Sequence, residues 1–174
     1  MLLLTIAPMC LVAIAIKLTS KGPVLYWSQR VGKNNQLFSM PKLRSMRIDT
    51  PAVATHLLQN PDQFLTPMGS FLRKSSLDEV PQLWSILAGH MSFVGPRPAL
   101  FNQQDLIDLR TQLDIHTILP GLTGWAQVNG RDELCIADKV NFDAAYLRKQ
   151  SFILDIKILC KTLMQIQKRN GISH

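Results

Sequence analysis

The chain has 174 residues, of which 47% are hydrophobic, and a formal net charge of +7 at pH 7. This composition excludes a disordered or fibrous protein, and the length is enough for one domain with a sizeable core. Residues 1–77 hold nine Lys or Arg and two Asp, whereas residues 78–174 hold ten charges of each sign. We therefore expect the first half to build a surface that faces an anion such as phosphate, phospholipid or nucleic acid.

Metal and nucleotide motifs of the common types are missing from the sequence. Cys10, Cys135 and Cys160 are odd in number, far apart and without CxxC or Cys/His ligand spacing. This pattern argues against a disulfide framework or a zinc site and fits a reducing compartment. The chain also contains no Walker-type phosphate loop, GxGxxG element, HExxH motif or nucleophile elbow.

The N-terminus is an uncharged apolar run, residues 2–16, that ends at Lys17. It is shorter than the roughly 20 residues that cross a hydrocarbon core, and Pro8 is expected to bend or break a helix there. Three interpretations stay open. The first is a secretory signal peptide that is cleaved near residues 13–15, although the run lacks a basic n-region. The second is a buried core helix. The third is a re-entrant membrane helix with Lys17 and Lys21 at the headgroups.

Gly22-Pro23 ends the apolar run, and strand-forming residues follow it. We expect a β-hairpin with strands over 24–31 and 36–40 and a turn over 32–35. The rest of the chain predicts mainly helices, separated by loops rich in Gly and Pro. In chain order we expect a short helix over 54–59, an amphipathic helix over 70–74, a helix over 79–88 ended by Gly89, a rigid loop over 92–100, a helix over 99–113, a turn-rich segment over 119–131, and helices over 132–149 and 152–166.

Leu100, Leu106 and Leu109 are expected to share one face of the helix over 99–113. Ala137, Val140, Ala144 and Leu147 are expected on one side of the helix over 132–149. These patterns give a fold class of α+β, mostly helical, with a small β-hairpin near the N-terminus. The helix over 152–166 has apolar residues on most of its sides, which suits a core or a membrane interface.

Asp78 and Glu79 place two carboxylates side by side at the predicted start of a helix. One interpretation is structural: Asp78 is the N-cap, or Ser76 is the cap and Glu79 its capping-box partner. The other is chemical, because carboxylates kept ionised at a helix N-terminus suit an acyl-phosphate nucleophile or a Mg²⁺ ligand. From these residues alone both interpretations stay open.

Basic residues near the two carboxylates could supply the positive charge that a phosphate needs. Arg73 lies five residues upstream of Asp78, and Arg97 lies between two prolines. A guanidinium held between two prolines suits bidentate phosphate binding, although a surface arginine in a turn explains the same pattern. The segment "KLRSMR" (42–47) is either a second basic patch or a solvated strand or loop.

The long motifs "SSLDEVPQLWSILAGHMSFVGPRPAL" and "LPGLTGWAQVNGR" closely resemble those of the bacterial sugar transferases, the monotopic polyprenyl-phosphate phosphoglycosyl transferases. The similarity also includes "GPVLYWSQRVG", "KLRSM" and "FILDIKIL", so it covers nearly the whole chain. The resemblance implies transfer of a phosphosugar from a UDP-sugar to polyprenyl (undecaprenyl) phosphate, with release of UMP. Such a reaction is the first membrane step in making a glycoconjugate such as a lipopolysaccharide.

The resemblance also assigns roles to residues of this sequence. Asp78 is implied as the nucleophile that forms a covalent phosphosugar-aspartate, with Mg²⁺ as cofactor and Glu79 as a neighbouring ligand or base. Phosphate contacts are implied for Arg73, Arg97, Lys42 and Arg44. Candidate contacts of the donor-site loop are Gln127, Asn129 and Arg131.

The resemblance further implies a location at the cytoplasmic face of the bacterial inner membrane. Residues 1–21 are then a membrane-embedded re-entrant helix and residues 22–174 a cytoplasmic catalytic domain, with amphipathic helices at the interface. Here Met1 already lies within the apolar run, so we expect the entering half of that helix to be short, and Ala7-Pro8 stands where the family commonly has Ser-Pro. The implied partners are the UDP-sugar, by analogy an N-acetylated amino sugar, the polyprenyl phosphate and membrane phospholipid. Nucleic acid is not among them, and a homo-oligomer is compatible with this interpretation.

Two other hypotheses remain. A non-catalytic basic protein could bind anionic lipid at the membrane surface, since basic residues lie near the apolar segment. Binding alone, however, gives no reason for paired carboxylates upstream of a rigid arginine loop. The chain could also be a secreted domain whose first residues are cleaved.

Overall fold

The computed structural model describes residues 2–51, 53, 59–130 and 133–170. The chain divides into two compact units. Unit 1 comprises Met1–Trp27 and Pro41–Pro81, and unit 2 comprises Ser28–Met40 and Gln82–His174. The boundary expected between residues 21 and 22 concerns a membrane-embedded segment, and it stays a prediction.

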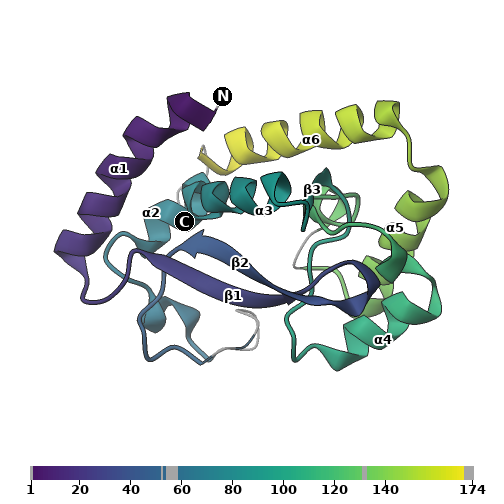
Figure 1. The fold of residues 1–174 in the computed structure, drawn as a ribbon, viewed down its shortest axis with the longest axis horizontal. Coiled ribbons are helices and arrows are strands. Elements are labelled where there is room, and N and C mark those ends of the chain that lie inside the picture. The colour runs from purple at the N-terminus through teal and green to yellow at the C-terminus, as the bar shows by residue number, and fades with distance from the viewer. Residues whose placement is uncertain (1, 52, 54–58, 131–132, 171–174) are drawn as a thin grey trace. The chain divides into compact units, whose positions relative to one another are not determined.

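Unit 1 begins with helix α1 (Leu2–Thr19), which continues through Pro8 (Figure 1). The expectation of a break there is wrong, because a proline removes one backbone donor while the other hydrogen bonds of a long helix keep its turns together. Within the described residues, no helix is both long enough and apolar enough to cross a membrane. The re-entrant form of this segment therefore stays a hypothesis.

The two sides of α1 have different surroundings. Ile16 is fully buried, whereas Leu11, Ile14 and Leu18 expose 70%, 56% and 81% of their surface. Ile16 packs with two other buried residues, Leu43 and Leu72, and these three form the core of unit 1. Partly buried residues around this core are Met9, Val12, Val24, Met68 and Leu77.

The predicted hairpin is present: β1 (Leu25–Val31) and β2 (Leu37–Leu43) form a two-stranded sheet (Figure 1). Its turn contains the 3-10 element η1 (Lys33–Asn35), in which Asn34 is left-handed with φ 55°. Asn adopts this conformation more readily than most residues. Strand β2 runs three residues past its predicted end, so that Lys42 lies on a strand.

The second part of unit 1 contains η3 (Pro61–Phe64) and α2 (Gly69–Ser75). Helix α2 confirms the amphipathic helix predicted over 70–74. The helix predicted over 54–59 falls largely on residues outside the described ranges.

The helix predicted over 79–88 is shorter and begins differently. It consists of the 3-10 element η4 (Leu77–Gln82) followed by α3 (Leu83–Leu87). Pro81 lies inside η4, where it lacks the N–H that an α-helical bond to the fourth preceding carbonyl would need. Gly89 has φ +78° just beyond α3, which confirms it as the predicted stop.

Unit 2 contains a second, parallel pair of strands, β3 (Ser92–Val94) and β4 (Gly121–Thr123). The sequence predicted loops for both segments, because three-residue strands are too short to show an alternating pattern. The chain comes very close to itself beside this pair. A Cβ on Gly124 would overlap the carbonyl oxygen of Gly95, so this approach requires a glycine.

Helix α4 (Gln104–Gln112) begins five residues later than predicted. The backbone N–H of Leu100 donates to Oε1 of Gln103 at 2.9 Å, and this bond forms a turn that precedes the helix. The predicted shared face is therefore wrong in part: Leu106 is buried on α4, Leu100 is buried before it, and Leu109 is exposed.

Helix α5 (Ile136–Lys149) begins four residues later than predicted. Val140 and Ala144 are buried on the predicted side, and Leu147 packs beside them, whereas Ala137 is exposed. The predicted position of Ala137 is therefore wrong: it lies in the first turn of α5, where the preceding residue, Ile136, packs against the core instead.

Helix α6 (Phe152–Asn170) confirms the predicted C-terminal helix. It is tied to α5 by Tyr146, whose hydroxyl donates to Oδ1 of Asp155 at 2.8 Å. Burial raises the pKa of the Tyr146 phenol, and Asp155 raises it further, so that Tyr146 stays a neutral donor. Two short 3-10 elements, η5 (Ile115–Thr117) and η6 (Gln127–Asn129), complete the unit.

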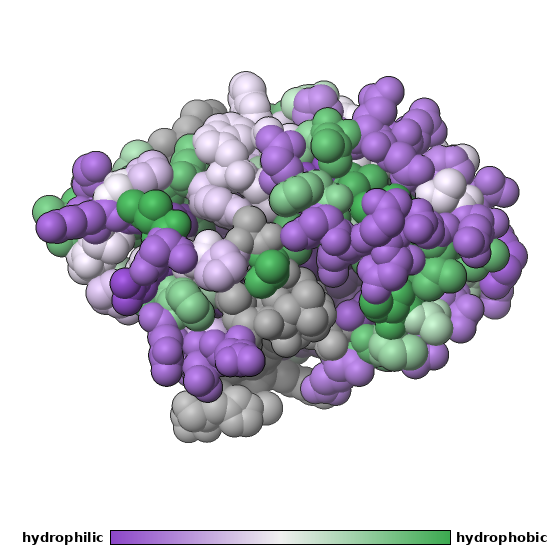
Figure 2. Space-filling model, turned by 90° about the horizontal axis from the view of Figure 1, so that it is seen from below, coloured by the Kyte–Doolittle hydropathy of each residue, from purple (hydrophilic) through white to green (hydrophobic). Residues whose placement is uncertain are grey.

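Two clusters of buried residues form most of the core of unit 2. One cluster joins α4 and α5, and the other joins β3, η6, α5 and α6. Their members are Ala99, Leu106, Ile115, Val140 and Ala144 in the first, and Val94, Val128, Tyr146 and Ile158 in the second. On the face of the molecule that Figure 2 shows, hydrophilic side chains predominate and the hydrophobic ones form separate small groups.

Candidate active site

Asp78 and Glu79 lie in the first turn of η4. Helix α2 ends at Ser76, which is left-handed with φ 57°, and η4 starts at the next residue. Asp78 is buried and is the second residue of η4, so its expected position as the N-cap is wrong. The turn at Ser76 ends α2 and precedes η4, which places both carboxylates in the first turn of a helix, where the helix dipole favours negative charge.

Lys42 on β2 is brought to Glu79 although 37 residues separate them in the sequence. Its Nζ lies 3.1 Å from Oε1 of Glu79, and the two side chains are only 15% and 17% exposed. A partly buried ion pair is less screened by solvent than a surface pair. Lys42 therefore places a positive charge directly beside the pair of carboxylates.

Helix α2 is fixed against the end of β2 at Ser45. The carbonyl oxygen of Ser45 accepts from the backbone N–H of Thr66 at 3.0 Å, and its hydroxyl accepts from Nε of Arg73 at 3.2 Å. A Cβ on Gly69 would overlap the same carbonyl, so α2 can begin this close only with a glycine. Arg73 is thus partly occupied by a structural contact, and its implied phosphate contact stays a prediction.

Arg44 is buried and is bound to the end of α1. Its guanidinium donates to the backbone oxygen of Ser20 at 3.0 Å and to the Ser20 hydroxyl at 2.6 Å, and also to the backbone oxygen of Lys21. A cation at a helix C-terminus binds carbonyls that have no partner inside the helix. These contacts give Arg44 a structural function in unit 1, and its implied phosphate contact stays a prediction.

In unit 2, Arg97 lies in the Gly-Pro-Arg-Pro loop (residues 95–98), directly after β3. Prolines restrict the backbone on both sides of Arg97, whereas residues 92–94 of the predicted rigid loop form strand β3. The carbonyl oxygen of Arg97 accepts from Nη1 of Arg110 at 2.7 Å, a contact that sequence reasoning missed. The side chain of Arg97 is half-buried.

The loop that precedes α5 is the predicted donor-site segment. Gln127 is buried, and neither side-chain atom Oε1 nor Nε2 has a hydrogen-bond partner among the described residues. Nδ2 of Asn129 donates to the backbone oxygen of Trp125 at 2.7 Å, which closes the turn. Arg131 lies outside the described residues. A buried amide with unused donors and acceptors is costly unless something binds it, so Gln127 is the strongest candidate of the three.

Asp78 and Glu79 are the candidate ligands for Mg²⁺. In the part of the chain that the structure describes, no group of three or more His, Cys, Asp or Glu gathers at one point. Mg²⁺ does not require such a cage, because it commonly binds one or two carboxylates and completes its shell with water and substrate phosphate oxygens. The hard oxygen donors of Asp78 and Glu79 therefore fit Mg²⁺.

Three known proteins are similar to this chain over nearly its whole length. The chain is 40% identical over 174 residues to the UDP-glucose:undecaprenyl-phosphate glucose-1-phosphate transferase of Escherichia coli (strain K12), covering 95% of this chain and 37% of that protein. It is 42% identical over 186 residues to the undecaprenyl-phosphate glucose phosphotransferase of Komagataeibacter xylinus, covering 98% and 35%. It is 38% identical to the exopolysaccharide production protein ExoY of Rhizobium meliloti (strain 1021), covering 97% and 81%.

The chain thus spans about a third of the length of the first two relatives and most of the length of the third. The model of the family described as "Bacterial sugar transferase" matches residues 1–169. The match includes all the candidate site residues described above, among them those on β2, α2, η4, η6 and the Gly-Pro-Arg-Pro loop. The chain belongs to the bacterial sugar transferase family.

Proposed function

We propose that this chain transfers a sugar-1-phosphate from a UDP-sugar to undecaprenyl phosphate, with Asp78 as the attacking group. The observation that carries the proposal is the buried Asp78 next to Glu79, which is itself paired with Lys42. Two relatives named above are called undecaprenyl-phosphate transferases of glucose or glucose-1-phosphate, which supports both substrates. Donors of other classes have no such support.

The transfer proceeds in two displacements at one phosphorus atom. A carboxylate oxygen of Asp78 attacks the sugar-bearing phosphate, the bond to the UMP oxygen breaks, and UMP leaves with the electron pair. An oxygen of the undecaprenyl phosphate then attacks the same phosphorus and displaces the carboxylate. The product is a sugar linked to the lipid through a diphosphate, and Asp78 returns to its starting state. The covalent intermediate lets the water-soluble donor and the lipid acceptor react one after the other.

Phosphoryl transfer depends mainly on positioned positive charge. Lys42 lies beside the carboxylates, and we assign Arg73 and Arg97 to the phosphates of the substrates. Asp78 and Glu79 would hold Mg²⁺, which when bound neutralises charge that develops on phosphate oxygens. Lys42 keeps Glu79 in place and offsets the repulsion between two adjacent carboxylates.

The identity of the sugar in the UDP-sugar donor is a separate question from the type of reaction. The sequence suggested an N-acetylated amino sugar, but the relatives' names give glucose and, in Salmonella typhimurium, galactose. We therefore infer a plain hexose as the first donor to test and an amino hexose as the second. Gln127, Asn129 and Arg131 are assigned to the donor as a group.

An undecaprenyl acceptor implies that the protein works at a membrane, which we place at the cytoplasmic face of the bacterial inner membrane. Exposed apolar residues on α1 and α6 support attachment to a lipid surface: Leu11, Ile14, Leu18, Phe152, Ile153, Leu163 and Met164. A re-entrant course of α1, the interfacial position of α6 and a homo-oligomer are further parts of the proposal.

The test mixes the purified full chain with Mg²⁺ and UDP-glucose, UDP-galactose or UDP-N-acetylglucosamine, and measures UMP with and without undecaprenyl phosphate. We expect UMP from one donor, continuous turnover only with the acceptor, and a loss of at least 10³-fold in Asp78→Asn, which lacks the nucleophilic charge. Mass spectrometry of the protein with donor alone should detect the phosphosugar adduct. Normal turnover by Asp78→Asn would refute the assignment of the nucleophile. Vesicle binding without UMP from any donor would instead support the non-catalytic lipid-binding protein.

A further inference from the structure

The backbone of the Gly-Pro-Arg-Pro loop is held through its carbonyl groups. Prolines lack the N–H, so carbonyl oxygens are the main points at which such a loop can be fixed. Besides that of Arg97, two of them accept from neighbouring segments of unit 2: Gly121 N–H donates to Pro96 O at 2.9 Å, and Arg30 Nη1 donates to Pro98 O at 3.1 Å. The next residue, Ala99, accepts from Val31 N–H at 3.0 Å.

The carbonyl of Arg97 itself is held by Arg110, which lies on α4. Arg110 in turn is held by Asp143 on α5: its Nη2 and Nε donate to Oδ2 of Asp143 at 2.6 Å and 3.1 Å. The two side chains are 12% and 1% exposed. A guanidinium is planar with its donors in fixed directions, so a carboxylate that fixes two of them also aims the third.

We propose that the Arg110–Asp143 pair is a positioning device that sets the direction of the Arg97 side chain toward the donor phosphates. This inference rests on the proposed transferase function, in which Arg97 contacts phosphate. Arg110 and Asp143 act through Arg97 and are positioning residues. Catalysis by phosphate-binding groups is sensitive to small displacements, so a device of this kind affects the rate directly.

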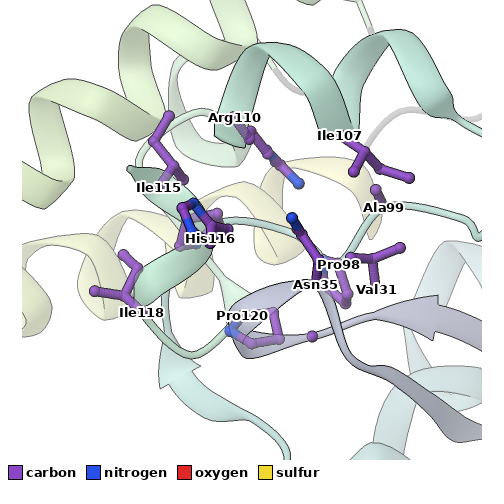
Figure 3. A pocket seen from close by; sticks show the side chains of 12 residues that line it. Val31, Asn35, Pro98, Ala99, Ile107, Arg110, Ile115, His116, Ile118 and Pro120 are labelled. Atoms are coloured by element: carbon purple, nitrogen blue, oxygen red, sulfur yellow. The ribbon is translucent and has the colours of Figure 1, made fainter. Parts of the chain in front are cut away.

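The Gly-Pro-Arg-Pro loop borders a pocket of unit 2. The pocket is lined among others by Pro96, Pro98, Ala99 and His116, and Figure 3 shows the side chain of Arg110 reaching into it. Pro96, Pro98 and Ala99 are buried, and apolar packing has no preferred direction. The Arg110–Asp143 ion pair adds a directional restraint to that packing.

Stability is a weak explanation for the pair. Burial raises the pKa of the Asp143 carboxyl, although Arg110 acts in the opposite direction. A raised value shows that the protein loses free energy by keeping this carboxylate charged and buried. Buried ion pairs are commonly no more stabilising than apolar residues of the same size, so geometry is the better reason for this one.

The first experiment measures the loop without using activity. Hydrogen–deuterium exchange of the full chain is compared between wild type, Arg110→Lys and Arg148→Lys, a control at an exposed position at the end of α5. We expect exchange at the amides of Gly95 and Leu100 to be at least tenfold faster in Arg110→Lys and unchanged in Arg148→Lys. Unchanged exchange of the loop in Arg110→Lys would overturn the inference.

The second experiment is a double-mutant cycle on UMP release. Arg110→Lys and Asp143→Asn should each lower kcat/KM for the donor about tenfold, as expected for one misplaced charged contact. In an Arg97→Ala background the same changes should cost less than twofold, because the group that they position is gone. A general structural defect would instead lower activity equally in both backgrounds, and that result would contradict the inference.

The two proposals fail in different ways. If the wild type releases no UMP from any donor, the transferase proposal is wrong, and the exchange measurement still decides whether Arg110 fixes the loop. If the wild type releases UMP and the effects of Arg110→Lys and Arg97→Ala multiply, the positioning role alone is wrong.

Discussion

At the scale of single residues, the ion pair between Lys42 and Glu79 is the most informative contact. It joins strand β2 to the first turn of η4 with 3.1 Å between Nζ and Oε1. Asp78 and Glu79 repel each other as neighbours, and a cation beside them reduces that repulsion. The pair explains how two carboxylates remain together at a partly buried position.

Removing the positive charge should therefore impair the reaction more than the fold. We expect Lys42→Met to lower the rate of UMP release at least tenfold, because Glu79 is left without its cation, and Lys42→Arg to retain more activity than Lys42→Met. Lys74→Met, at an exposed position at the end of α2, is the matched control. Equal rates for Lys42→Met and Lys74→Met would exclude Lys42 from the active site.

Asp143 gives a prediction about pH. Its pKa is raised in the folded state, so its contribution to stability is complete below the ordinary value of 3.8 and is lost as pH rises through the raised value. The free energy of unfolding of wild type minus that of Asp143→Asn should thus fall as pH rises from 3.8. Urea denaturation at a series of pH values measures this difference. A difference that grows with pH would mean that Arg110 outweighs burial.

At the scale of elements, α2 positions the site in unit 1. The helix is placed by contact with Ser45, and it ends at the left-handed Ser76 immediately before η4. Its buried residue Leu72 packs with Ile16 and Leu43, so α1 and β2 share in placing it. The carboxylates are thus carried by a short rigid segment.

Gly69 is the position where this arrangement is most sensitive. A methyl group there would overlap the carbonyl oxygen of Ser45, so Gly69→Ala should destabilise the protein by about 2 kcal/mol through forced movement of α2. Thermal unfolding measures the loss, and Ser70→Ala, at an exposed neighbouring position, is the control. Equal midpoints for the two variants would show that α2 can shift freely.

At the scale of the whole molecule, charge and apolar surface are distributed unevenly along the chain. Residues 1–77 carry the excess positive charge, and α1 exposes Leu11, Ile14 and Leu18. Apolar side chains next to basic residues favour the surface of an anionic bilayer. This distribution fits a lipid-linked acceptor.

Binding to vesicles tests this property separately from catalysis. We expect the full chain to cosediment with vesicles that contain anionic phospholipid, and Leu11→Ser to lower the partition coefficient about tenfold through the lost apolar contact. Leu37→Ser on β2, which removes a leucine that is 61% exposed, against 70% for Leu11, should have no such effect. Equal binding by both variants would contradict the role assigned to α1.

The local elements were largely predictable from sequence. The hairpin, α2, α5 and α6 follow from patterns of neighbouring residues, and the stop at Gly89 follows from its chemistry. The errors occur where an element is too short for a pattern, as in β3 and β4, or where a contact sets its start. Leu100, for example, is drawn into a turn by Gln103 and so precedes α4.

The sequence by itself determined the family and the candidate site residues, because Asp78-Glu79 and the Gly-Pro-Arg-Pro loop lie in continuous motifs within the segment that matches the family. Only the tertiary structure decided their partners. Lys42 meets Glu79, Arg110 meets Asp143, and Arg44 binds the end of α1. Each of these contacts joins residues more than 20 positions apart. Local patterns report how neighbouring residues shape the backbone, whereas ion pairs between distant segments form only when burial of the core brings those segments together.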